Sequence, residues 1–152
     1  MSIAVAIADA VVATLNAHDF AMAFTAERHY LPRYELSEMQ DLRVTVVPKE
    51  MTTTTVSRGA VSRDVTVDVA VQQKLDAPGN PAPGSEQADT DALMDLSEAI
   101  AEHLRVTALL GMPGPMWIQT EHTAIYAPEH LEQMRQFTSV MAFTFRITPG
   151  NA

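Results

Sequence analysis

The residues best suited to acid–base or metal chemistry are three adjacent Glu–His pairs. They are Glu102–His103, Glu121–His122 and Glu129–His130. Carboxylate and imidazole groups together can bind zinc or manganese. However, the chain has no HExxH or similar ligand spacing, and the three pairs fall on three different predicted elements. We therefore predict no metal site; stoichiometric zinc or manganese in the purified protein would favour the alternative of a small metal-binding enzyme.

Other catalytic signatures are missing from the sequence. The chain has no cysteine, which excludes disulfides, thiolate zinc sites and a cysteine nucleophile. It also lacks the GxSxG pattern of serine hydrolases and the GxxxxGK[ST] and GxGxxG loops that hold phosphate groups. The sequence thus predicts a protein that is not an enzyme, with no catalytic residue and no cofactor.

Arginine and tyrosine side chains are concentrated in two places, and both residue types are enriched at the energetic centres of protein interfaces. We expect a subunit or partner interface there. The alternative is that the tyrosines cover the edge of the core and the arginines pair with acidic groups on a solvated hairpin. The candidate residues are Arg28, Tyr30, Arg33 and Tyr34 in one segment, and Arg58 and Arg63 in the other.

Length and charge limit the remaining possibilities. With 152 residues, 47% of them hydrophobic, the chain can form a single domain with its own core, over residues 1–152. The net charge of -9 argues against a nucleic-acid-binding protein, which needs a basic surface. No apolar run reaches the roughly 20 residues that span a membrane, so we expect no membrane partner.

The elements that must position these residues are organised around one strand, predicted over Arg63–Leu75. Valine occupies every second position from Val65 to Val71, which is the period of a strand with one buried face. The opposite face is polar and is expected to meet water or another subunit.

Further strands are predicted where apolar residues alternate, and helices where they recur every three or four residues. Pro48 is expected to end the second strand. Residues 49–62 form either a mobile loop or a protruding hairpin, and the proline- and glycine-rich stretch around 76–88 is expected to be a flexible loop. The predicted strands are 20–28, 42–48, 63–75, 116–126 and 137–147, the helices 2–16 and 90–105, with a short helical turn at 128–136.

This order predicts an α+β fold. A mostly antiparallel sheet carries two helices packed on one face, with a long protruding hairpin or loop.

The order of elements also resembles that of a known family. The carrying motifs are the RHYLPRY connection at 28–34, the VTVVP strand at 44–48, the Ser–Arg pairs at 57–58 and 62–63 and the EHLEQMRQFTSVMAFTFRI segment at 129–147. With the alternating-valine strand, they resemble the small tail-completion and tail-terminator proteins of long-tailed bacteriophages and prophages. The resemblance covers most of the chain in element order.

The resemblance implies a structural virion protein. Such proteins assemble as a ring, typically of six subunits, on the end of the tail tube, where they stop tube polymerisation and form the surface that joins the head. The implied partners are further copies of the chain, the tail tube protein and a head-completion or connector protein. The implied location is the head–tail junction of the virion, after assembly in the bacterial cytoplasm.

DNA would pass through such a ring without being bound. Acidic residues facing the bore would let it slide, a hypothesis motivated by the net charge of -9, and a bore lined with lysine and arginine would contradict it. A soluble dimeric binding or accessory domain is the other alternative, which a small closed oligomer with an apolar groove would favour.

Overall fold

The computed structural model describes residues 2–30, 42–74, 85–124 and 136–148. They form five strands and two helices. The predicted helical turn at 128–136 lies almost wholly outside the described residues, as do Arg33, Tyr34 and the pair Glu129–His130.

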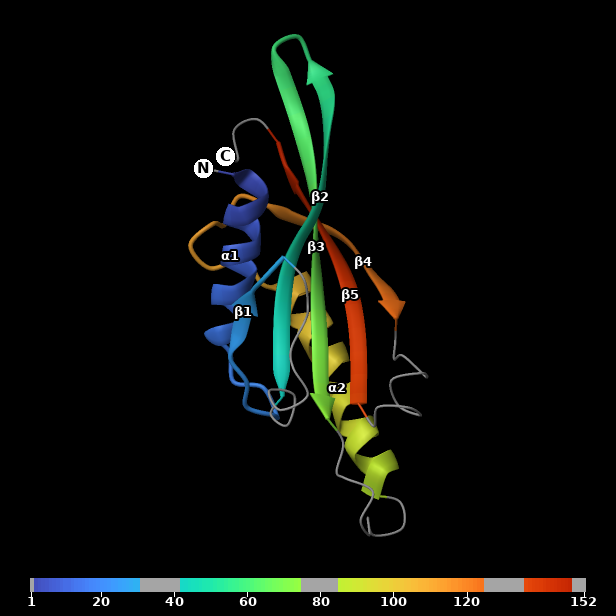
Figure 1. Ribbon diagram of the computed structural model, residues 1–152. Helices are drawn as coiled ribbons and strands as arrows, with labels where there is room; N and C mark the ends of the chain where they lie inside the picture. The colour runs from blue at the N-terminus through green and yellow to red at the C-terminus, as the bar shows by residue number, and fades with distance from the viewer. Residues whose placement is uncertain (1, 31–41, 75–84, 125–135, 149–152) are drawn as a thin grey trace.

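The strands make one sheet in the order β1-β2-β3-β5-β4 (Figure 1). All neighbours are antiparallel except β1 and β2, which are parallel. The prediction that this strand is central is confirmed, because β3 pairs with β2 on one side and with β5 on the other. The strands are β1 (Ala26–Arg28), β2 (Arg43–Ser57), β3 (Ala60–Lys74), β4 (Met116–Ala124) and β5 (Gln136–Ile147).

Both helices pack against the sheet, as the sequence predicts for an α+β fold. Helices α1 (Ile3–Asn16) and α2 (Ser85–Val106) share one continuous core with the valine face of β3. Val65 and Val67 are fully buried there, opposite Phe145 and Phe143 of β5. Burying one such valine stabilises the fold by about 1.5–3 kcal/mol.

Helix α1 begins where the sequence predicts. The Ser2 hydroxyl accepts a hydrogen bond from the backbone N–H of Val5 at 3.4 Å, which satisfies one of the free donors at a helix start. Ile7, Val11 and Leu15 recur every four residues and are buried. Helix α2 buries its predicted stripe in the same way: Leu93, Leu96, Ile100 and Leu104.

Pro48 does not end β2, which was predicted to stop there. The strand continues to Ser57, with an irregularity in pairing between Pro48 and Glu50. The carbonyl of Val46 faces outward, because it accepts from the N–H of His29, the residue that follows β1. Backbone groups two residues apart in a strand point to the same edge, so the nitrogen of Pro48 faces the same outer edge as the Val46 carbonyl. Strand β3 pairs with the other edge of β2, so the missing N–H of Pro48 removes no hydrogen bond to β3.

The strand predicted over 20–28 is shorter than expected, because only Ala26–Arg28 pairs with a neighbour. Phe20, Met22 and Phe24 alternate with exposed residues and pack against the core, so the pattern of burial is real. Alternation identifies the buried side but not a partner strand, which is why the sequence overestimated this element.

Two further expectations need correction. Residues 85–88, expected in a flexible loop, belong to helix α2; residues 75–84 lie outside the described part. The polar face of the sheet is not wholly open, because Gln72 and Thr138 are buried on it. At that end of the sheet the Nε2 of Gln136, itself buried, donates to the Thr138 hydroxyl at 2.9 Å.

Candidate functional site

The feature that stands out from the body is the end of the β2–β3 hairpin, residues 49–63, which we call the arm (Figure 1). The sequence left residues 49–62 open between loop and hairpin, and the structure shows a regular hairpin. Its turn is the two-residue loop Arg58–Gly59 between the paired residues Ser57 and Ala60. Gly59 has φ +78, the left-handed conformation that tight hairpin turns favour and glycine adopts without strain.

The arm extends past the rest of the sheet. Strand β5 pairs with β3 only as far as Arg63, so beyond that point the arm has two strands. Every residue from Lys49 to Gly59 is exposed, including the apolar Met51 at 47% and Val56 at 59%. The arm therefore lacks a core of its own within the described structure.

The arm also leaves one strand edge open. Strand β1 covers the outer edge of β2 only from Val44 to Val46, where the N–H of His29 donates to the Val46 carbonyl at 3.0 Å. Beyond Val46, no strand in the described ranges pairs with that edge. Strand β4 forms the opposite border of the sheet and, among the described strands, pairs only with β5.

The charge of the arm is opposite to that of the whole chain. Lys49, Arg58 and Arg63 outnumber Glu50, which gives the arm a net charge of +2 in a chain of net charge -9. Lys49 lies 3.7 Å from Asp68. Arg58 and Arg63 form no ion pair with any described residue, so the predicted alternative, in which acidic groups neutralise them, does not hold for this part of the chain.

An ion pair fixes the base of the arm to the sheet. The Arg146 guanidinium of β5 donates to both carboxylate oxygens of Asp64 in β3, at 2.8 and 3.1 Å. This contact holds the pKa of Asp64 below its usual value. The arm therefore starts from a rigid row of the sheet.

Arg28 and Tyr30 do come together, but not with the arm. The Arg28 guanidinium lies 5.5 Å from the centre of the Tyr30 ring and 2.7 Å from the carboxylate of Asp9 in α1. Strand β1 and the tip of the arm are well separated (Figure 1). The four predicted interface residues that the structure describes thus form two separate groups, and Arg28 has a structural partner.

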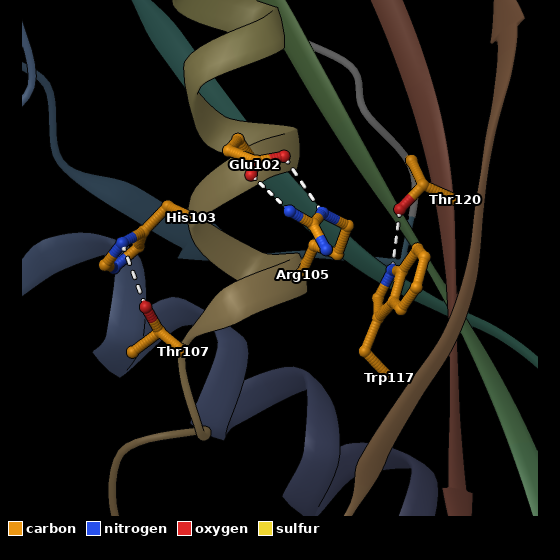
Figure 2. A network of polar contacts seen from close by, with 6 residues as sticks. All are labelled: Glu102, His103, Arg105, Thr107, Trp117 and Thr120. Carbon is orange, nitrogen blue, oxygen red and sulfur yellow. Dashed lines mark hydrogen bonds and ion pairs between the residues drawn. The ribbon is translucent and has the colours of Figure 1, made fainter.

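The two Glu–His pairs that the structure describes do not gather into one site. Glu102 pairs with Arg105 on the same helix (Figure 2). Glu121 and His122 are exposed on β4. His103 bonds the Thr107 hydroxyl at 3.3 Å. Within the described ranges, no three His, Asp or Glu side chains are placed to hold a metal ion.

Arg105 and Trp117 join α2 to β4, a contact that the sequence did not reveal (Figure 2). The Arg105 guanidinium lies 5.9 Å from the centre of the Trp117 ring. The indole N–H of Trp117 donates to the Thr120 hydroxyl at 2.8 Å. In the sequence, Arg105 is notable only for its place in the last turn of a helix, where a basic side chain favours the helix dipole.

A second contact joins the ends of the two helices. The rings of His18 and His103 stack at 4.1 Å between centroids, and Phe20 packs edge-on against both. Burial, followed by the charge of His18, lowers the pKa of His103 below its ordinary value. The folded protein therefore favours neutral His103.

We expect this pair to make stability depend on pH. Because the folded protein binds its proton on His103 less readily than the unfolded chain does, stability is full above the ordinary histidine pKa of about 6.5 and falls as the pH drops below it. Replacing His103 with glutamine should flatten the decline of Tm between pH 7 and 5.5. The exposed His122→Gln is the control, and an equal flattening in both variants would contradict the assignment.

An open pocket of about 690 Å³ lies where β2 begins and β3 ends, at the opposite end of these strands from the arm. Among the described residues that line it, Arg43 is the only charged one, and it already has an interaction partner. The pocket is lined by Met22, Ala23, Phe24, Thr25, Leu42, Arg43 and Gln73. None of the described helices is long and apolar enough to cross a membrane.

The chain is similar to known proteins in structure rather than in sequence. No protein-family model matches the chain, and no curated protein matches it by sequence. Among solved structures, it is similar to a chain described as the PVC sheath/tube terminator in the extended state, of an extracellular contractile injection system. The TM-score is 0.44 and the identity 14%, over 97% of this chain and 57% of that one, so this chain spans little more than half of its length.

Proposed function

We propose that this protein is a structural subunit that assembles as a closed ring on the end of a tail-like tube. There it ends polymerisation of the tube and forms the surface that joins the head. The observation that carries the proposal is the arm, with an open strand edge and arginines that lack partners in the described structure.

An open edge of this kind is a liability for a protein that works alone, because unpaired N–H and C=O groups recruit other strands. Monomeric proteins protect such edges with charged residues or proline. From Met51 to Ser57 the arm has neither; four of the seven residues are threonine, which favours strands. The edge therefore fits a subunit that pairs with another chain.

The resemblance in element order gives the kind of assembly. It supports a ring, with six subunits as the expected number, a tail tube protein on one side and a head-completion or connector protein on the other. A head-to-tail contact that closes on itself produces such a ring. DNA passes through the bore of the ring, and the ring is located at the head–tail junction of a virion.

The test compares the full chain with a variant in which residues 54–62 are replaced by Asn–Gly. This loop joins Thr53 to Arg63, which already face each other, so the body of the sheet is kept. Light scattering over a concentration series and negative-stain microscopy of the same fractions give the mass and shape of the particles.

We expect the full chain to form rings with a central hole and the shortened variant to remain a folded monomer. A full chain that stays monomeric, or forms a dimer without a hole at every concentration, would overturn the ring. Identical rings from the shortened variant would show that the arm does not carry the assembly.

A further inference from the structure

We infer that the open edge of β2 on the arm pairs, antiparallel, with the open edge of β4 in a second copy of this chain. The inference rests on the proposed ring and names the two surfaces that would form its contacts. It follows from strand direction, from the position of β1, from side-chain faces and from charge.

Strand direction makes the two edges compatible. From β2 through β3 and β5 to β4 every pairing is antiparallel, so β2 and β4 run in opposite directions at the two borders of the sheet. A second copy placed alongside in the same orientation therefore brings β2 antiparallel to β4. The contact joins different surfaces of the two copies, which is the kind that can close into a ring.

The position of β1 decides which part of β2 is used. In one copy, Met116 at the start of β4 lies in the same row as Thr52, through Arg146 and Asp64. A neighbour at the same height would meet β1, which occupies the edge at Val44–Val46. The neighbour must therefore be shifted along the strands, so that its β4 lies beside the arm. The free stretch 49–57 and β4, over 116–124, each have nine residues.

Side-chain faces agree when Thr52 lies opposite Glu121 of the second copy. Thr52 shares a sheet face with Asp64, and Glu121 shares the same face with Ala142 and Asp68, away from the valines. In this register the end of the arm that carries Val56 lies beside the start of β4 that carries Met116, and these apolar side chains are 59% and 53% exposed. The irregularities in pairing between Thr55 and Ser57 and between Trp117 and Gln119 fall in the same stretch. The pairing thus covers apolar groups that each copy exposes.

Charge favours this arrangement over pairing of two arms. The arm carries a net charge of +2, whereas β4 has Glu121 and no lysine or arginine. Two arms side by side would bring like charges together, and so would two β4 strands. The second copy's β4 is therefore the better partner.

Cysteine cross-linking tests the contact directly, because the chain has no cysteine of its own. Thr52→Cys and Glu121→Cys both change exposed residues. Within one copy three strand spacings, about 14 Å, separate these positions across the sheet, and they also lie in different rows, so they are too far apart for a disulfide. Only contact between copies can join them.

We expect the double variant to give, under mild oxidation, a ladder of covalent multimers that stops at the size of the ring. A mixture of the two single variants should give cross-linked dimers only, and neither single variant alone should cross-link. Thr54→Cys with Glu121→Cys detects a register shifted by two residues, which keeps the same face.

The outcomes separate this inference from the proposed function. Rings that form without a cross-link in either double variant would overturn the contact and leave the ring intact. Dimers from Thr52→Cys alone would show arm-to-arm pairing and would also overturn it. Neither rings nor cross-links at any concentration would overturn both.

Discussion

Replacing Phe143 with alanine is expected to lower the free energy of unfolding by about 3–5 kcal/mol, a large part of the 5–15 kcal/mol typical of a domain. Phe143 is fully buried on β5, opposite Val67 of β3 and Thr120 of β4. Its ring is part of the core between the sheet and the two helices. Because these elements hold the neighbouring side chains in place, we expect alanine to leave a cavity. Urea or thermal unfolding would measure the loss.

The adjacent residue provides a matched control. Thr144 faces the other side of the sheet, where its hydroxyl lies 3.1 Å from that of Thr66. Thr144→Val keeps the strand preference and removes this one hydrogen bond, so the expected loss is about 0.5–1.5 kcal/mol. Losses of equal size in the two variants would contradict the assignment of the core to the valine face.

Replacing Asn16 with alanine is expected to cost about 2–3 kcal/mol, because one amide holds two backbone groups. The Asn16 oxygen accepts from the N–H of Ala26 at 2.7 Å, and its nitrogen donates to the carbonyl of Ala26 at 3.1 Å. Ala26 is buried at the start of β1, so alanine at position 16 leaves its two polar groups without these partners. Chemical unfolding would measure the effect.

Asn16→Asp separates the two bonds, since aspartate keeps an acceptor for the Ala26 N–H but loses the donor. We expect the free energy of unfolding of Asn16→Asp to lie between those of the wild type and of Asn16→Ala. The described residues contain no other asparagine, so a second Asn-to-Ala variant cannot serve as the control. Thr123→Ala, at an exposed position on β4, is used instead. A cost no larger than that of Thr123→Ala would show that α1 and β1 do not depend on this amide.

The sequence was most informative where burial has a clear period. The valines of β3 and the leucines of α2 predicted their elements and their buried faces, because a single side of each meets the core. The same rule overestimated the strand at 20–28. Phe20 and Phe24 stack on each other at 5.3 Å and pack on the core without any ladder of hydrogen bonds.

Contacts between distant residues could not be predicted in the same way. The Arg105–Trp117 contact and the Asn16–Ala26 pair depend on how separate elements meet, which no local pattern encodes. Pro48 shows the same limit of sequence patterns. Whether a proline ends a strand depends on which edge of the strand its nitrogen faces, and the sequence does not show this. For the candidate site, the sequence predicted Arg58 and Arg63 as interface residues, which stays a prediction. It left open whether they lie on a loop or a hairpin, and it could not show that they lie apart from Arg28 and Tyr30.

The pairing of β3 with β5 has a consequence for how the protein is made. Thr66 and Thr144, which face each other in the sheet, are 78 positions apart in the chain. At synthesis rates of about 5–20 residues per second, several seconds separate the emergence of these two strands from the ribosome. During that interval β3 has β2 as a partner while its other edge is open. The second edge of β3 stays unpaired until β5 has been synthesised. We therefore expect the nascent chain to be most prone to wrong strand pairing just before β5 is complete.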